Sequence, residues 1–152
     1  MNTGRKGEQV FAAIMNEVGY EVEDVSSNPE YFSKDIDFII TNKQGKTATI
    51  EVKYDNKISN TGNLYLETFN INSEQWKYDG WWLHCEADYL AYGDANGEFF
   101  YMFHLGDLRE RVKKLNCRTA FCIGDSEGLL VPLEKVRDLY TIACFNSPFA
   151  SK

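Results

Sequence analysis

The stretch that decides the fold runs from Asp35 to Lys53 and reads D-I-D-F-I-I-T, a polar turn, and then T-A-T-I-E-V-K. Its two outer segments alternate in the two-residue period of a strand, and residues 42–46 between them are polar and include a glycine. This pattern predicts a β-hairpin. Pairing of Thr41 with Thr47 sets a register in which the alternate residues of both strands share one face of the sheet.

This register places two acids side by side. Asp37 lies opposite Glu51, with β-carbons about 5 Å apart, and Lys53 follows one step along the same face. Neighbouring carboxylates inside a sheet repel each other, and a divalent cation between them relieves the repulsion. Oxygen ligands favour Mg²⁺ or Mn²⁺, and a lysine beside the ion can hold a water nucleophile or offset anionic charge. The alternative is a solvated strand face on which Asp35 pairs with Lys53. The apolar residues Ile36, Phe38, Ile39 and Ile40 argue against it, because they indicate a strand that is covered on both faces.

The hairpin motif D-x-F-I-I…I-E-V-K resembles the core of the PD-(D/E)xK nuclease superfamily, which has the restriction-endonuclease-like fold. The opening G-R-K-G-E-Q-V-F, on a first helix that ends in V-G-Y-E-V, is similar to its Holliday-junction-resolvase branch and to related phage or repair nucleases. The likeness covers residues 4–67 and extends only loosely to the C-terminal half. No proline precedes the aspartate, which departs from the family pattern. The pairing argument favours Asp37 over Asp35.

The resemblance implies a role for each matching residue. Asp37 and Glu51 would bind Mg²⁺ or Mn²⁺, the carbonyl of Val52 and the first-helix Glu8 would add ligands, and Lys53 would be catalytic. The implied activity is metal-dependent hydrolysis of DNA phosphodiester bonds by an endonuclease, with junction or branched DNA as one candidate substrate and a homodimer as the expected assembly. Two alternatives stay open: a catalytically inactive nuclease-fold module that binds DNA or protein, and an acidic accessory protein whose motif match is accidental.

Further candidates lie outside the motif. The segment after Lys53 is rich in short hydrogen-bonding side chains, which can hold phosphates without reading bases; an ordinary surface loop is the alternative. With the first-helix cations, the candidate DNA contacts are Arg5, Lys6, Lys57, Thr61 and Asn63. Second-tier candidates are Glu67, in a segment similar to one in phage nucleases, and Gln75, in a short helix predicted at residues 73–78.

The length, composition and net charge of the chain limit which classes of protein it can belong to. The 152 residues, 43% hydrophobic and 26% charged, fit one soluble domain over residues 1–152. No membrane span or signal peptide is visible, which predicts a cytoplasmic protein. The net charge of −7 argues against a general nucleic-acid binder. It does not exclude a nuclease, because acidic metal ligands count as negative and a bound ion reverses the local sign. Four cysteines without a C-x-x-C pair indicate a buried, reduced set.

The rest of the chain predicts the surroundings of the hairpin. We expect an amphipathic helix over residues 4–18 and an edge strand at 20–25. An aromatic hairpin at 81–92 and 98–105 extends the sheet, and a helix from about Asp107 carries a basic outer face. Short strands at 119–124 and 129–132 and a last helix from Pro132 follow. The predicted architecture is α/β: a central mixed β-sheet flanked by helices, restriction-endonuclease-like.

Overall fold

The computed structural model describes residues 3–70, 79–122 and 126–145. The helices are α1 (Thr3–Glu17), α2 (Pro29–Phe32), α3 (Ile58–Thr61), α4 (Trp81–His84), α5 (Leu105–Lys114) and the 3-10 helix η1 (Leu133–Leu139). The strands are β1 (Glu21–Asp24), β2 (Phe38–Thr41), β3 (Thr47–Asp55), β4 (Asn63–Asn70), β5 (Tyr89–Asp94), β6 (Phe99–His104), β7 (Arg118–Cys122), β8 (Ser126–Pro132) and β9 (Tyr140–Ala143). None of the helices in these described ranges is both long and apolar enough to cross a bilayer.

The strands form two sheets. The larger sheet has the order β1-β2-β3-β5-β6-β9, and β3 and β5 are its parallel neighbours while its other pairs are antiparallel. The smaller sheet is antiparallel, in the order β4-β8-β7. The predicted central mixed sheet with flanking helices is confirmed, as is the edge position of β1. The separation of β4, β7 and β8 into a second sheet was not predicted.

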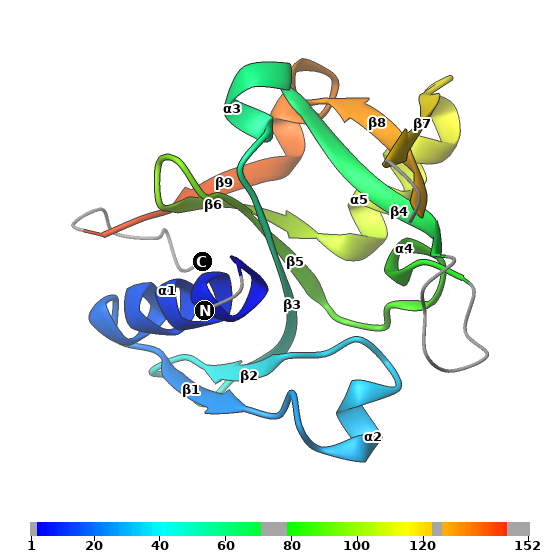
Figure 1. Cartoon of the computed structure of the whole chain (residues 1–152). Helices are drawn as coiled ribbons and strands as arrows, with labels where there is room; N and C mark the ends of the chain where they lie inside the picture. The colour runs from blue at the N-terminus through cyan, green and yellow to red at the C-terminus, as the bar shows by residue number, and fades with distance from the viewer. Residues whose placement is uncertain (1–2, 71–78, 123–125, 146–152) are drawn as a thin grey trace.

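Helix α1 covers one face of the larger sheet (Figure 1). Its apolar stripe buries Phe11, Ile14 and Met15 completely against the even-numbered residues of β2 and β3. Gly7 lies where a β-carbon would collide with the ring of Tyr54, so only glycine allows the helix to approach β3 this closely. The predicted amphipathic helix is therefore confirmed.

The opposite face of the larger sheet is covered by the smaller sheet together with α4 and α5 (Figure 1). Leu64 and Leu66 from β4, Leu108 from α5 and Phe103 from β6 meet there and are fully buried. The odd-numbered residues of β3, which include Glu51, point toward this second layer. One face of β3 is therefore apolar and covered by a helix, and the other face carries charge into a crevice.

Several local predictions are wrong. The predicted strand at 81–92 begins as the helix α4, and only its second half is strand β5. Arg109 does not lie on a solvated face, because its guanidinium donates to the carbonyls of Trp82 and Cys85. The predicted last helix is present as a 3-10 helix with a kink at Val136. The predicted helix at residues 73–78, with Gln75, lies outside the described residues.

Candidate functional site

The register of the β2–β3 hairpin brings the two predicted acids together. Thr41 pairs with Thr47 and Phe38 with Ile50, as the turn length predicted. Asp37 directly precedes β2, and its backbone N–H donates to the carbonyl of Ile50 (2.8 Å). The carboxyl group of Asp37 lies close enough to that of Glu51 to raise its pKa. Two acids separated by fourteen positions in the sequence thus share one small volume.

The sheet opens at this point. Strand β2 begins at Phe38, whereas β3 continues to Asp55, so the edge of β3 beyond the hairpin has no strand beside it on the β2 side. The N–H of Val52 donates to Oδ2 of Asp37 (2.9 Å). The N–H and C=O of one strand residue point the same way, so the carbonyl of Val52 also faces this opening. The carboxyl groups of Asp37 and Glu51 and the backbone carbonyl of Val52 therefore lie around the open edge of β3.

Lys53 lies beside this pair. Its Nζ is 3.6 Å from Oε2 of Glu51, and its side chain keeps 34% of its surface exposed. Burial lowers the pKa of Lys53, but the attraction of Glu51, Asp37 and Asp35 outweighs burial, so its pKa is raised and the ammonium stays charged. The ammonium also lies over the ring of Trp81, 5.0 Å from the centroid. An anionic group that enters the opening would meet a fixed positive charge.

The surroundings of Glu51 and Glu8 disfavour a negative charge on either side chain. Glu51 is only 4% exposed, and burial raises its pKa well above the ordinary value; Lys53 opposes this shift, and the hydrogen bond and charge of Asp37 add to it. Burial, Asp37 and Asp24 raise the pKa of the half-buried Glu8 on α1 to about 7, against the opposing charges of Arg5 and Lys53. Both shifts disfavour the ionised form, and a nearby cation would reverse them.

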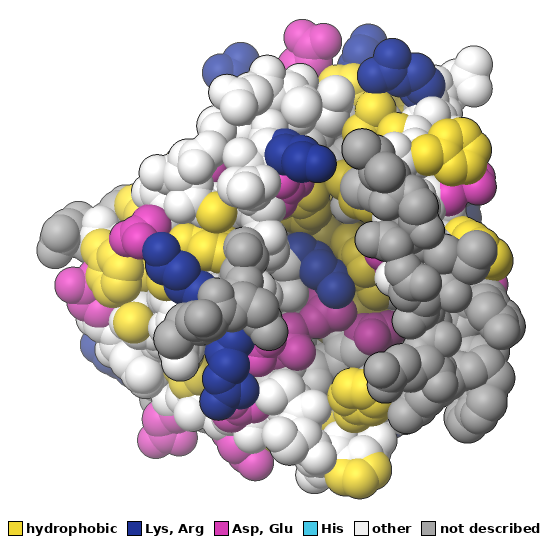
Figure 2. All heavy atoms as spheres, viewed as in Figure 1, with side chains coloured by type: hydrophobic (Ala, Val, Ile, Leu, Met, Phe, Trp, Pro, Cys, Tyr) yellow, Lys and Arg dark blue, Asp and Glu magenta, His cyan; other side chains and the backbone are white. Residues whose placement is uncertain are grey.

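A cavity of about 290 Å³ opens over these residues. It is bounded by the start of α1, the loop before β2, the middle of β3 and the exposed ring of Phe32. Figure 2 shows acidic and basic side chains gathered in a hollow near the middle of the face seen in Figure 1. The lining residues are Gly4, Glu8, Ser26, Phe32, Asp35, Ile36, Asp37, Glu51, Val52, Lys53 and Tyr54.

This site fits a hard divalent cation held through oxygen. The two adjacent carboxyl groups, one of them buried with a raised pKa, can supply oxygen ligands to a cation. The cation would neutralise their negative charge. Within the described residues, no group of three or more His, Cys, Asp or Glu side chains lies close enough to hold an ion by side chains alone. The fit is therefore to Asp37, Glu51 and the Val52 carbonyl, with water completing the shell, as Mg²⁺ usually requires.

The other predicted residues lie at different distances from this centre. Glu8 lines the same cavity, whereas Lys6 on the same helix pairs with Glu98 (3.8 Å) at the surface. Arg5 contributes charge to Glu8. Lys57 and Thr61 are exposed at α3, which follows the end of β3. The structure brings only part of the predicted set together, and Lys6 is not in it.

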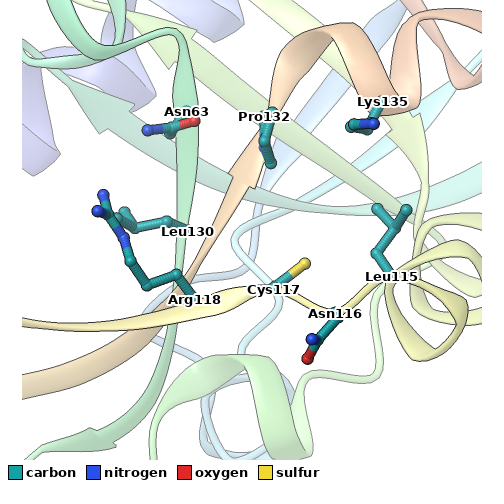
Figure 3. A pocket seen from close by; sticks show the side chains of 8 residues that line it. All are labelled: Asn63, Leu115, Asn116, Cys117, Arg118, Leu130, Pro132 and Lys135. Atoms are coloured by element: carbon teal, nitrogen blue, oxygen red, sulfur yellow. The ribbon is translucent and has the colours of Figure 1, made fainter.

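Asn63 and Glu67 belong to β4. Glu67 accepts a hydrogen bond from Asn70 (3.3 Å) and adds to the negative field at Lys53. Asn63 lines a different and larger cavity of about 370 Å³, between the smaller sheet, η1 and the loop after α5 (Figure 3). That cavity has Arg118 and Lys135 at its rim and no acidic lining residue, so it offers no carboxylate for a metal ion.

Two residues near the site were not predicted. His84 at the end of α4 places Nδ1 3.1 Å from Oδ2 of Asp35, a residue with a φ of 55° in the loop before β2. This contact joins α4 to the loop that presents Asp37, and Asp35 also adds negative charge near Lys53. Trp81, from the same helix, lies under Lys53. Neither contact has a signal in the local sequence, because α4 reaches the hairpin only through the tertiary fold.

The fold is similar to that of a protein of known structure. The chain is similar to the bacterial homing endonuclease I-Ssp6803I, with a TM-score of 0.52 and 16% sequence identity, over 85% of this chain and 76% of that chain. No protein-family profile matches the sequence. No curated protein matches it either. At this identity the likeness shows a shared mixed α/β fold and nothing finer.

Proposed function

We propose that this protein is a metal-dependent endonuclease that hydrolyses DNA phosphodiester bonds. One observation carries the proposal: Asp37, just before β2, lies beside Glu51 of β3, and the Lys53 ammonium lies 3.6 Å from Glu51 at the same opening. This combination suits hydrolysis of a phosphodiester, which needs an activated water and relief of anionic charge. A protein with the same fold is a homing endonuclease, which supports the same class of reaction.

The residues would divide the work as follows. Asp37, Glu51 and the Val52 carbonyl would hold one Mg²⁺ or Mn²⁺, with Glu8 close enough to add a charge. When bound, the ion would lower the pKa of a water and neutralise phosphate charge. Lys53 would orient that water or contact a non-bridging oxygen, and its charge would offset the charge that develops at phosphorus.

DNA as the substrate must be reconciled with a net charge of −7. Several of the negative charges lie at the proposed metal site itself, where the ion would reverse the local sign. Arg5, whose charge reaches Glu8, and Lys57, at the start of α3, would then contact the backbone on either side of the cut. Branched or junction DNA as the preferred substrate, and a homodimer as the assembly, rest on the sequence resemblance.

A direct assay tests the activity. The purified protein is incubated at micromolar concentration with supercoiled plasmid, linear duplex, single strands and four-way junctions, each with Mg²⁺, Mn²⁺ or EDTA. We expect cleavage that requires the metal and leaves 5′-phosphate and 3′-hydroxyl ends. Cleavage that persists in EDTA, or no cleavage of any substrate, would refute the proposal. DNA binding without cleavage would instead favour the inactive nuclease-fold module.

Lys53→Ala is the matched variant for this assay. Lys53 is one-third exposed and its removal leaves the core intact, so circular dichroism and DNA binding should match the wild type. Cleavage should fall by about a thousandfold, because the variant lacks the ammonium that lies beside Glu51. A Lys53→Ala protein that cuts at the wild-type rate would show that the lysine has another role.

A further inference from the structure

Helix α4 presents two adjacent tryptophans that are equally buried and have different partners. Trp81 and Trp82 are each 7% exposed, and their rings meet edge to face at a centroid distance of 5.9 Å. The ring of Trp81 lies under the Lys53 ammonium, 5.0 Å from its centroid. The ring of Trp82 lies under the Arg109 guanidinium, at 5.3 Å. The first contact faces the proposed site, and the second faces α5.

The backbone of helix α4, which carries Trp81, is held from two sides. The guanidinium of Arg109 donates to the carbonyls of Trp82 (2.9 Å) and Cys85 (2.7 Å), which ties α4 to α5. Gly80, just before α4, packs so closely on the backbone of Glu67 that a β-carbon would not fit. A four-residue helix has little stability of its own, so these contacts hold it in place.

Lys53 needs such a partner because of what surrounds it. Its nearest opposite charge is Glu51, which is also a proposed ligand of the divalent ion. A cation that shares the Glu51 carboxylate weakens the hold of that carboxylate on the ammonium and repels the ammonium as well. The face of an indole ring attracts an ammonium through its quadrupole, and it neither binds Mg²⁺ nor takes a proton from the lysine. Trp81 can hold Lys53 without competing for the metal.

We infer that Trp81 is a positioning residue, whose ring keeps the Lys53 ammonium at the phosphodiester site when the divalent ion is bound. This inference rests on the proposed nuclease function and adds to it a residue outside the D…ExK motif. The competing view is that Trp81 only fills the core between the two sheets. The two views differ in what should follow when the ring is replaced by another aromatic or by an aliphatic side chain.

The kinetic experiment uses four variants: Trp81→Phe, Trp81→Leu, Trp82→Phe and Trp82→Leu. Trp81→Leu should lower kcat by about tenfold, with KM within about twofold of wild type, because the lysine is misplaced while DNA still binds. Trp81→Phe should recover most of the rate, since phenylalanine keeps a π face. The Trp82 variants control for lost core volume, and they should keep kcat even where they unfold at a lower temperature.

A second measurement needs no catalysis. In protein labelled with ¹³C-lysine, the ε-methylene protons of Lys53 should be shifted upfield by the ring current of Trp81, with and without Mg²⁺. The Lys53→Ala spectrum assigns the signal. Trp81→Leu should move it to the ordinary lysine position, and Trp82→Leu, which keeps the Trp81 ring, should move it far less.

The outcomes separate this inference from the function on which it rests. If the wild type cuts DNA and the leucine variants at 81 and 82 lose the same fraction of kcat, the ring is only core and the inference is wrong. An upfield shift that vanishes when Mg²⁺ is added would also overturn it. If the wild type cuts nothing, the proposed function fails, and the inferred role fails with it, even where the NMR shift persists.

Discussion

Two buried acids, Glu51 and Asp94, show how different the surroundings of a carboxyl group can be within one sheet. They are the buried charged residues of the described part of the chain, and each is 4% exposed. Asp94 ends β5, where its Oδ1 accepts hydrogen bonds from the backbone N–H groups of Asn96 (2.9 Å) and Gly97 (3.3 Å). Glu51, in the neighbouring strand β3, faces a second carboxyl group and the ammonium of Lys53.

The difference lies in the kind of partner. Asp94 stabilises the turn between β5 and β6, and its charge is balanced by dipoles that the turn itself provides. Glu51 is placed against Asp37, an arrangement that opposes the ionised form and destabilises the metal-free fold. Burial alone therefore does not identify a functional acid. A buried acid whose neighbours disfavour its charge is the better candidate. Glu51 and Asp94 provide a matched pair for experiments.

The largest effect should come from Glu51→Gln. This change removes the charge of a proposed ligand while keeping its size, and it leaves Asp37 with a hydrogen-bond donor instead of a second acid. Cleavage should fall by about a thousandfold or more, measured as plasmid nicking at saturating Mg²⁺. The unfolding temperature without metal should stay equal or rise. A variant that cuts normally would show that Glu51 is no ligand.

The response of stability to metal should distinguish the same two acids. Mg²⁺ at about one hundred times its Kd should stabilise the wild type by about 2.7 kcal/mol, a rise of several degrees in Tm, because it binds only the folded site. Asp94→Asn should keep this rise, and Glu51→Gln should lose most of it. Calorimetry with and without EDTA measures both. An equal rise in both variants would place the ion elsewhere.

The strand register that joins the two acids Asp37 and Glu51 was predictable from the sequence. The register of the β2–β3 hairpin was predictable, because a polar five-residue turn and a two-residue period leave few ways to pair the strands. The meeting of Asp37 with Glu51 followed from it. The place of Lys53 on the same face followed as well, since a strand alternates its side chains.

Contacts across the fold were not predictable. Residues Trp81 and Trp82 were assigned to a strand because aromatic residues favour strands, but packing against Arg109 and Lys53 holds them in a helical turn. The assignment of β4 to a second sheet depends on its pairing with β8, far along the chain. The roles of the site residues remain predictions that the experiments above test.

Asp94→Asn should have a moderate effect, and on stability alone. The variant keeps the shape of the side chain but loses the charge that strengthens two hydrogen bonds to the turn. We expect the free energy of unfolding to fall by about 1–3 kcal/mol in urea titrations, with kcat unchanged. Glu23→Asn, on the exposed strand β1, is the control for loss of one negative charge. A large loss of cleavage with unchanged stability would reverse the roles assigned to the two acids.

The smallest effect concerns Glu8, whose pKa is raised from 4.5 to about 7 by burial, Asp37 and Asp24. A carboxyl group with a raised pKa in the folded state binds more protons there than in the unfolded chain between these two values. Without metal, its contribution to stability is therefore complete below pH 4.5 and is lost as the pH rises to about 7. Because Glu8 is only half-buried, solvent screening limits this loss to about 1 kcal/mol.

Glu8→Gln should remove that part of the pH dependence, so its metal-free stability at pH 8 should exceed that of the wild type. Urea titrations in EDTA from pH 4.5 to 8 measure this, with Glu23→Gln as the exposed control. Mg²⁺ should flatten the wild-type curve in the same way, because a cation between Asp37 and Glu51 lowers the pKa of every nearby carboxyl group. If Mg²⁺ leaves the Glu8 contribution unchanged, the ion lies too far from α1 for Glu8 to belong to the site.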